Sequence, residues 1–308
     1  MAQEMRQTHL RTSINSNEDD IMKLYVLEKY FSYRLPGQHY YNGVMWNSLV
    51  PRERLIQMMT FHVKPDDVIV SGYPKSGNTW LAEIVYLIEH DVDIEKSNSI
   101  PLYLRVPHLE GELSDLMINK LDSPRAYKSH LSYAMLPKEA HEKRPKIVHI
   151  IRDPHDIAVS YYHFYRSLSQ LGNYTGTWDE FLSMFMAGYV CCGDWFQYAE
   201  DWWLHRNEAN VLIVRYEDMI RDLRTEVLRI ADFLRRPLDE EQVSSIVRRT
   251  SFNNMKKNPM LNLDGLSDID RTISPFMRKG EVGDWKNYFS SLQLEAFDKL
   301  IPATLREQ

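Results

Sequence analysis

The sequence lacks several features that would point to particular classes of protein. Its only two cysteines, Cys191 and Cys192, are neighbours in the chain, so we do not expect disulfide bonds to stabilise the fold. The formal net charge of -6 argues against nonspecific binding to nucleic acid or anionic membranes, which requires a basic face. An anionic ligand would therefore have to be held by a local group of cations.

Long apolar stretches are also missing. No segment approaches the roughly 20 apolar residues that span a bilayer, and the N-terminus lacks the apolar core of a secretory signal. These absences predict a cytoplasmic protein that is neither anchored nor exported. Residues 1–20 are polar and contain Arg6 and Arg11 but few acids before Glu18, which favours a flexible tail over a weak organelle-targeting segment.

The composition that remains is that of a globular protein. The 308 residues are 44% hydrophobic and 26% charged, and no linker-like stretch divides them. Short, nearly continuous apolar runs predict buried parallel strands at residues 66–73, 125–130, 146–151 and 210–217. Apolar residues at helical spacing predict helices at residues 80–88, 153–168, 178–187, 194–206, 219–234 and 291–301. This alternation predicts one α/β domain over residues 21–308, with a central, mostly parallel sheet flanked by helices.

The segment GYPKSGNTW, from Gly72 to Trp80, joins the first predicted strand to its helix. A strand that ends in a glycine-containing turn and feeds a helix directs backbone N–H groups and the positive end of the helix dipole at an anion. The nucleotide-hydrolase pattern, GxxxxGK followed by serine or threonine, is not met, because Lys75 precedes Ser76 and Gly77. The segment alone fits either a phosphate site or an ordinary turn with a solvated lysine.

Two other places carry cations that suit phosphate. Arg152 follows the strand at 146–151 directly, and open α/β sheets bind ligands at the carboxyl ends of their strands. Near the C-terminus, Arg278 and Lys279 stand beside Gly280, which could form a second anion cradle. Taken alone, Arg152 fits a salt bridge with Asp156 equally well, and a solvated basic turn is the better explanation of the second group.

Five segments together resemble the signature blocks of one family. In chain order they are YPKSGNTW (73–80), IRDPHDIAVSYYHFYR (151–166), RYEDM (215–219), TSFNNMKKNPM (250–260) and FMRKGEVGDWKNYF (276–289). They resemble the cytosolic sulfotransferases, which use 3'-phosphoadenosine-5'-phosphosulfate (PAPS) and release 3'-phosphoadenosine-5'-phosphate (PAP). The likeness extends from about Tyr40 to about Arg306 and is highly specific, because several blocks are long.

The resemblance implies a residue for each part of PAPS. The 5'-phosphosulfate loop would comprise Lys75, Ser76, Gly77, Asn78 and Thr79. The 3'-phosphate site would comprise Arg152, Ser160, Arg278, Lys279 and Gly280, and the neighbouring Phe276 and Met277 would also bind the cofactor. The adenine site would comprise Trp80, Tyr216, Thr250, Ser251, Phe252, Asn253, Asn254 and Met255. Aromatic side chains suit this role because a purine stacks on them. Without the family, Trp80 and Phe252 would be interpreted as core residues.

The segment AYKSHLSYAMLP (126–137) resembles the family's acceptor segment, with Lys128, Ser129 and His130 as substrate-binding residues. His130 would be the general base, since the pKa of histidine, about 6.5, lies near working pH. Lys75 would stabilise the leaving phosphate oxygen, Lys128 would assist the transferring sulfuryl group, and Ser160 would steer Lys75. On sequence grounds alone, a single histidine at a strand end is more often structural.

No metal-binding pattern such as CxxC, HExxH or an acidic calcium loop occurs, so we predict transfer without a metal. Two other functions stay open: a PAPS-binding protein without turnover, and a small-molecule kinase with a related phosphate loop. The kinase would require magnesium-binding carboxylates and ATP. The silent binder would be expected to lack Lys75 or His130, and both are present.

Three departures from the family bear on specificity and assembly. Asn78 stands where many members carry threonine. The family's dimer motif keeps Lys286 and Glu295, but Ser290 and Ser291 replace Thr-Val, which puts a homodimer in doubt. The two cysteines lie in a region that frames the acceptor pocket in relatives.

The acceptor itself is the least defined part of the prediction. Segments 40–46, 105–111 and 161–165 resemble pocket segments, and their aromatic residues suggest a flat, mostly apolar phenol, sterol or other alcohol, although each aromatic could equally belong to the core.

Overall fold

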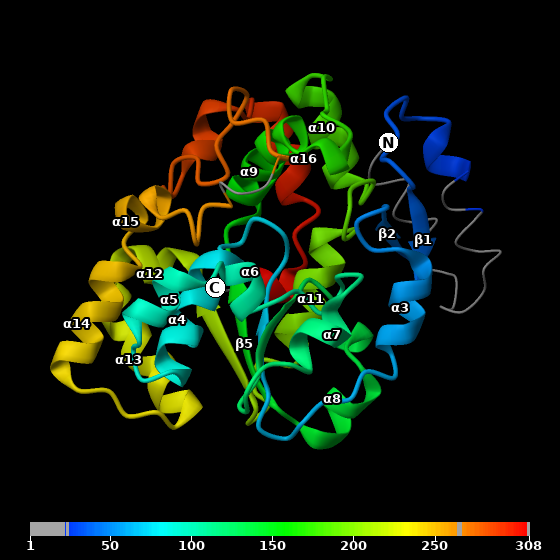
Figure 1. Cartoon of the computed structure of the whole chain (residues 1–308). Helices are drawn as coiled ribbons and strands as arrows, with labels where there is room; N and C mark the ends of the chain where they lie inside the picture. The colour runs from blue at the N-terminus through cyan, green and yellow to red at the C-terminus, as the bar shows by residue number, and fades with distance from the viewer. Residues whose placement is uncertain (1–21, 23–24, 264–266, 307–308) are drawn as a thin grey trace.

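Four parallel strands form the centre of the fold: β3 (Val68–Ser71), β4 (Ala126–Ser129), β5 (Lys146–Ile151) and β6 (Val211–Arg215). The computed structural model describes residues 22, 25–263 and 267–306 of the chain. Each strand lies inside one of the four runs predicted from the sequence. Helices cover both faces of the sheet (Figure 1), so the predicted α/β class is confirmed.

The strand order, β4-β3-β5-β6, determines where a ligand can bind. From β3 the chain crosses to β4 on one side, and then to β5 and β6 on the other side. Connections that leave in opposite directions open a crevice at the carboxyl ends of the two strands between them. That crevice lies between β3, which is followed by the glycine loop, and β5, which is followed by Arg152.

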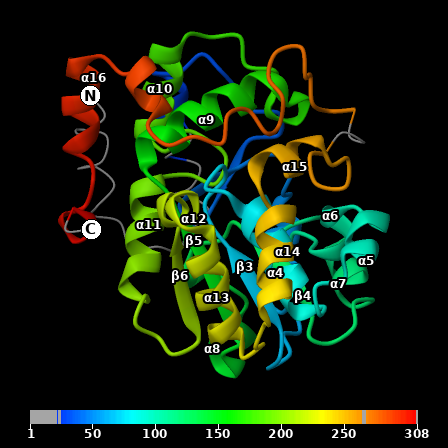
Figure 2. The same cartoon turned by 90° about the vertical axis from the view of Figure 1, so that its left-hand side faces the viewer.

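Side chains that alternate along each strand bury both faces of the sheet. Ile69 and Ile147 belong to one apolar cluster, which includes residues of α9 (Pro154–Ser167), α10 (Trp178–Met186), α11 (Trp195–Leu204) and α16 (Ser291–Asp298). Val70 and Val148 belong to a second cluster, with residues of α4 (Asn78–Glu89), α12 (Tyr216–Arg221), α13 (Leu223–Leu234) and α14 (Glu240–Arg249). Figure 2 shows α4, α13 and α14 in front of the sheet, and in Figure 1 these helices and α11 lie on opposite sides of β5.

Shorter elements complete the fold. A two-stranded antiparallel hairpin, β1 (His39–Tyr41) and β2 (Val44–Trp46), packs beside the first cluster. Further short helices are α3 (Arg52–Met58), α5 (Ile94–Ser99), α6 (Leu102–Arg105), α7 (Ser114–Ile118), α8 (Lys138–Lys143) and α15 (Phe252–Lys257), with 3-10 turns at Tyr133–Met135, Ser169–Leu171, Asp284–Asn287 and Ala303–Leu305. Within the described residues, no helix is long and apolar enough to cross a bilayer.

The structure corrects one predicted helix. Residues 219–234 were expected to form a single helix, but the chain turns at Asp222 and forms α12 and α13 instead. The carboxylate of Asp222 accepts a hydrogen bond from the backbone N–H of Thr225, which caps α13. The N-terminal tail predicted at residues 1–20 lies outside the described residues.

Candidate functional site

The register of the sheet brings the predicted site residues together. Ser71 pairs with Ser129, so the first residues beyond β3 and β4 are neighbours, and Nδ1 of His130 lies 2.6 Å from the carbonyl oxygen of Gly72. Ile151 pairs with Arg215, and the residues that follow them, Arg152 and Tyr216, are in contact. The parallel strands therefore place segments far apart in sequence at one edge.

The loop after β3 has the backbone of an anion site. Gly77 precedes α4 with a φ of 109°, and a Cβ added there would lie 2.9 Å from the ring of Tyr216, so only glycine fits. The side-chain amide of Asn78 donates to the carbonyl oxygen of Tyr73 at 2.8 Å, which holds the turn closed. The first residues of α4 line the cleft, and the first N–H groups of a helix have no partner within it, so they can donate to an anion there.

Lys75 extends from this loop into an aromatic setting. Its Nζ atom lies 4.2 Å from the ring centre of Phe164 and 4.5 Å from that of Phe276. Burial, together with the charges of Arg152 and Arg278, lowers the pKa of Lys75 to about 7. Among the described residues no carboxylate pairs with this ammonium group, so an anionic ligand could form an ion pair with it without displacing an acidic side chain.

Arg152 is held at the start of α9 by hydrogen bonds to backbone oxygens. Its guanidinium donates to the carbonyl oxygens of Lys75 and Glu281, each at 3.1 Å, and lies 4.3 Å from the ring centre of Tyr216. The salt bridge with Asp156 that the sequence left open is present as a long ion pair, with 4.0 Å between Nη2 of Arg152 and the carboxylate. Asp156 also accepts hydrogen bonds from the backbone N–H groups of residues 283 and 285, which fastens the basic segment that contains Arg278 and Lys279 to α9.

The basic segment forms the facing wall of the site. Arg278 donates to Asp284 at 2.5 Å, and Lys279 also bonds to this carboxylate. Burial alone would raise the pKa of Asp284, but the hydrogen bonds from Lys279 and Arg278 lower it to about 2. Gly280 has a φ of 70°, and a Cβ there would approach the ring of Phe252 to 2.2 Å, so the backbone and the aromatic ring form one wall.

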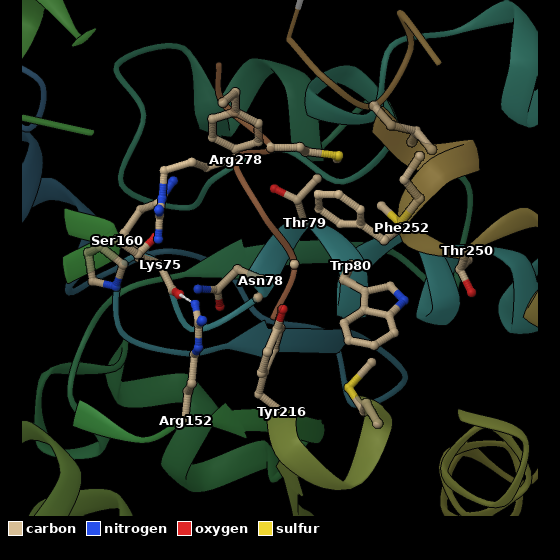
Figure 3. A pocket seen from close by; sticks show the side chains of 18 of the residues that line it. Lys75, Asn78, Thr79, Trp80, Arg152, Ser160, Tyr216, Thr250, Phe252 and Arg278 are labelled. Atoms are coloured by element: carbon tan, nitrogen blue, oxygen red, sulfur yellow. Dashed lines mark hydrogen bonds between the residues drawn. The ribbon is translucent and has the colours of Figure 1, made fainter. Parts of the chain in front are cut away.

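These groups line a single cleft of about 540 Å³. Figure 3 shows side chains from α4, α9, α12, α15 and the basic segment directed toward the same space. The predicted cofactor residues that line it are Lys75, Gly77, Asn78, Thr79, Trp80, Arg152, Ser160, Tyr216, Thr250, Ser251, Phe252, Met255, Phe276, Met277, Arg278, Lys279 and Gly280. The expectation that three distant basic segments share one cleft is met by this geometry.

Four predicted residues do not line the cleft, for local reasons. Ser129 is wholly buried, because alternate residues of a strand point to opposite faces and its neighbours Lys128 and His130 take the cleft side. Ser76 is 1% exposed, and its backbone N–H donates to Tyr73 within the loop. Asn253 and Asn254 lie on the exposed side of α15.

Lys128 and His130, the residues expected to bind the acceptor, line the part of the cleft next to β4. A carbonyl oxygen can only accept, so Nδ1 of His130 carries the proton in its contact with Gly72, and Nε2 is left as the basic nitrogen. Burial lowers the pKa of His130, which keeps the ring neutral near pH 7. Burial also lowers the pKa of Lys128 to about 8.

Two residues of this region were not predicted individually. His108 lines the cleft, and Glu110 lies below it, where it accepts a hydrogen bond from Ser129 at 2.8 Å and another from the backbone N–H of His130. Both lie in the segment 105–111 that was expected to form part of the pocket. A single acid in an irregular segment gives no periodic signal, so its burial could not be anticipated.

Segment 161–165 contributes Phe164 to the cleft, whereas several other residues of the regions compared with a pocket lie in the core. The hairpin residues Tyr40 and Trp46 are buried in the first apolar cluster. Cys191 and Cys192 are free and buried, and the carbonyl oxygen of Cys191 accepts a hydrogen bond from Tyr161. None of these four side chains lines the described cleft.

The cleft fits a ligand with more than one negative charge. Nε of Arg152 and Nε of Arg278 are buried without a hydrogen-bond partner among the described residues, so each guanidinium can still donate. A buried donor without a partner is unfavourable, and phosphate oxygens would satisfy both. In the described part of the chain, no group of three or more histidine, cysteine or acidic side chains is arranged to hold a metal ion.

Comparison with known proteins identifies the family. The sulfotransferase domain family matches residues 65–307. The chain is 44% identical to sulfotransferase 1A1 of Bos taurus over 253 residues, which cover 80% of this chain and 85% of the relative. It is 39% identical to sulfotransferase 1 family member D1 of Rattus norvegicus over 254 residues, covering 80% and 86%.

Solved structures agree with this match. A retinol dehydratase crystallised with androsterone and PAP superposes with a TM-score of 0.77 at 26% identity, covering 88% of this chain and 89% of that one. A mouse sulfotransferase complexed with PAP has a TM-score of 0.73 at 33% identity, covering 88% and 95%. The chain therefore belongs to the sulfotransferase family of enzymes.

Proposed function

We propose that the chain transfers the sulfuryl group of PAPS to a hydroxyl of a small, mostly apolar acceptor. The observation that carries this proposal is the shared cleft of Lys75, Arg152 and Arg278. The solved relatives that contain PAP support the choice of ligand. Androsterone in one of them supports an apolar alcohol as acceptor.

In this proposal each part of the cleft binds one part of PAPS. Lys75 and the N–H groups at the start of α4 hold the 5'-phosphosulfate. Arg152, Arg278 and the backbone near Gly280 hold the 3'-phosphate, which would satisfy the two free guanidinium nitrogens. The adenine would lie among the rings of Trp80, Tyr216 and Phe252, which is the arrangement that base stacking favours.

PAPS supplies an activated sulfuryl group, and the chain supplies position, charge and a base. His130 takes the proton of the acceptor hydroxyl at Nε2, since its Nδ1 proton is engaged by the carbonyl oxygen of Gly72. Lys75 stabilises the negative charge that develops on the leaving phosphate oxygen. Lys128 faces the same space and neutralises charge on the transferring group. Ser160, which also lines the cleft, would orient Lys75.

The test is an assay with radiolabelled PAPS and a panel of phenols, sterols, catechols and retinoid-like alcohols, without added metal. We expect label transfer by the wild type and a loss of roughly 10²- to 10⁴-fold in His130→Ala, the range for removal of a general base. PAP binding by calorimetry should be unchanged in this variant. Undiminished transfer in His130→Ala would remove His130 as base.

The same assay separates the other candidate functions. PAP binding without transfer to any acceptor would support a silent PAPS-binding protein. Transfer of phosphate from ATP in the presence of Mg²⁺, with no use of PAPS, would support a small-molecule kinase.

We also infer that residues 21–308 act as one sulfotransferase domain and that the protein works in the cytoplasm. The family match over residues 65–307 supports the first inference. Limited proteolysis should leave a stable fragment that begins near residue 21, and cell fractionation should recover the protein in the cytosolic fraction. Recovery with organelles would favour the targeting alternative for residues 1–20.

A further inference from the structure

Two histidines lie side by side on the acceptor side of the cleft. His108 follows α6 and pairs through its backbone with Lys128 in an isolated parallel β-bridge, and His130 follows β4. Both line the cleft, and their ring centres are 4.8 Å apart. The proposed reaction uses only His130 as a base, so the second imidazole has no role in it. A few placed polar groups on the wall of a pocket orient the ligand that binds there, and the free nitrogen of a second imidazole is such a group.

The buried carboxylate of Glu110 lies close to both histidines. One of its oxygens, Oε1, accepts from the hydroxyl of Ser129 and from the backbone N–H of His130. The other, Oε2, is buried without a hydrogen-bond partner among the described residues and lies 3.8 Å from Nδ1 of His108. Burial would raise the pKa of Glu110, but His108, His130 and Ser129 lower it to about 2, so the carboxylate is charged.

At 3.8 Å the contact is too long for a hydrogen bond, but the negative charge of Glu110 favours the tautomer of His108 that carries its proton on Nδ1, the nitrogen nearer the carboxylate. Burial and the ammonium of Lys128 lower the pKa of His108, so the ring is neutral and its Nε2 bears a lone pair. The side chain is 38% exposed, because it opens onto the cleft. No donor among the described residues reaches Nε2, which leaves it for a ligand.

The two rings therefore present the same kind of group. Nδ1 of His130 is engaged by Gly72, and Nδ1 of His108 faces Glu110. Each Nε2 can accept one hydrogen bond. Since the ring centres are only 4.8 Å apart, two hydroxyl groups on neighbouring carbon atoms of one acceptor can reach both nitrogens.

We propose that His108 is a second binding residue of the acceptor site and that the enzyme prefers acceptors with a second hydroxyl next to the one that is sulfated. The proton of the reacting hydroxyl passes to Nε2 of His130, and the neighbouring hydroxyl donates a hydrogen bond to Nε2 of His108. This proposal rests on the proposed sulfotransferase function. It adds the chemistry of the acceptor, a vicinal diol or catechol.

The direction of this hydrogen bond makes the proposal specific. Catechol offers a second hydroxyl that can donate, 2-methoxyphenol offers an oxygen that can only accept, and phenol offers neither. We expect the wild type to have a kcat/KM for catechol roughly tenfold or more above that for 2-methoxyphenol, which is the discrimination of a site that loses one buried hydrogen bond. This comparison needs no variant, so it does not depend on the folding of one.

His108→Phe keeps a flat ring of similar size and removes the nitrogen. We expect it to lower kcat/KM for catechol by roughly tenfold, mainly through KM, and to leave kcat/KM for phenol within about twofold, because the lost interaction is with the second hydroxyl. His108→Gln, which can place an amide near Nε2, should restore part of the loss. His62→Phe, at a histidine that is 67% exposed outside the cleft, is the matched control and should change neither substrate.

The outcomes distinguish this proposal from the proposed function. If the wild type transfers sulfuryl groups to no member of the wider acceptor panel, the function itself fails. If it sulfates other members of that panel but none of these three compounds, the function stands and the preference for a vicinal hydroxyl is overturned. If it sulfates all three and His108→Phe leaves the ratio of catechol to phenol unchanged, the function stands and the role of His108 is overturned. The proposal is also overturned if His108→Phe, with normal PAP binding, loses kcat for phenol, because His108 would then act in the proton transfer.

Discussion

Gly280→Ala should weaken PAP binding through a single added methyl group. The residue has a φ of 70°, and its new Cβ would lie 2.2 Å from the ring of Phe252. The left-handed backbone costs a non-glycine residue about 1–2 kcal/mol. Removing the clash requires the ring or the backbone to shift, and such overpacking costs about 1–3 kcal/mol more. Because Phe252 and Gly280 form one wall of the cleft, we expect PAP affinity to fall roughly tenfold to a hundredfold.

Gly283→Ala is a matched control for this experiment. Gly283 has a φ of 86°, so it carries the same backbone strain, but its added Cβ would meet only the side chain of Lys286 at 3.9 Å. Calorimetric titration of both variants with PAP therefore separates strain from the clash with Phe252. Equal PAP affinities in the two variants would refute the reasoning, since the wall formed by Phe252 and Gly280 would then have no part in binding.

Further predictions concern protonation and assembly. Burial and two neighbouring guanidinium groups lower the pKa of Lys75 to about 7, so its amine is mostly neutral at pH 8. The phosphates of PAP favour the charged amine, so PAP binding at pH 8 should take up a proton. Binding heats that do not depend on the ionisation enthalpy of the buffer would contradict this. Burial lowers the pKa of His130, so kcat/KM should fall on acidification with an apparent pKa below about 6.5, and that limb should vanish in His130→Ala. Burial alone would lower the pKa of His155, but the carboxylates of Asp153 and Asp298 raise it. The protonated ring therefore stabilises the fold below pH 6.5, and this stabilisation is lost as the pH rises through the raised pKa. The loss of Tm in His155→Phe should be larger at pH 6 than at pH 9. The altered dimer motif predicts a monomer of 36.5 kDa by light scattering, and a stable dimer at micromolar concentration would count against it.

Much of the fold could be predicted because the buried strands are continuous apolar runs. β5 matches its predicted range, residues 146–151, at both ends, because Pro145 precedes and Arg152 follows a run whose four central residues are buried. The break at Asp222 was missed because neither glycine nor proline marks it, and the only signal is an aspartate three residues before Thr225. For the segment that forms the β1–β2 hairpin, the sequence left open whether its aromatic residues line a pocket or belong to the core, since short aromatic-rich strands do not differ in composition from pocket walls.

Site residues that belong to a sequence motif could be predicted, whereas the direction in which a side chain points depends on the folded geometry and was harder to predict. Lys75 and Arg152 follow strands whose carboxyl ends meet at the crevice, so their convergence follows from strand order. Ser129 was included because it lies between two functional residues, but strand alternation turns it away from the cleft. The Ser290 that alters the dimer motif caps α16 by accepting from the backbone N–H of Gln293, a local role that the motif comparison did not reveal.

A competition titration of PAP against adenosine 5'-phosphate tests most directly whether three distant basic segments bind one doubly phosphorylated nucleotide. The two ligands differ only in the 3'-phosphate that Arg152 and Arg278 are proposed to bind. We predict that the wild type binds PAP roughly a hundredfold more tightly, and that Arg278→Gln loses most of this difference while its affinity for adenosine 5'-phosphate stays the same. Equal affinities of the wild type for the two nucleotides would contradict the proposed site.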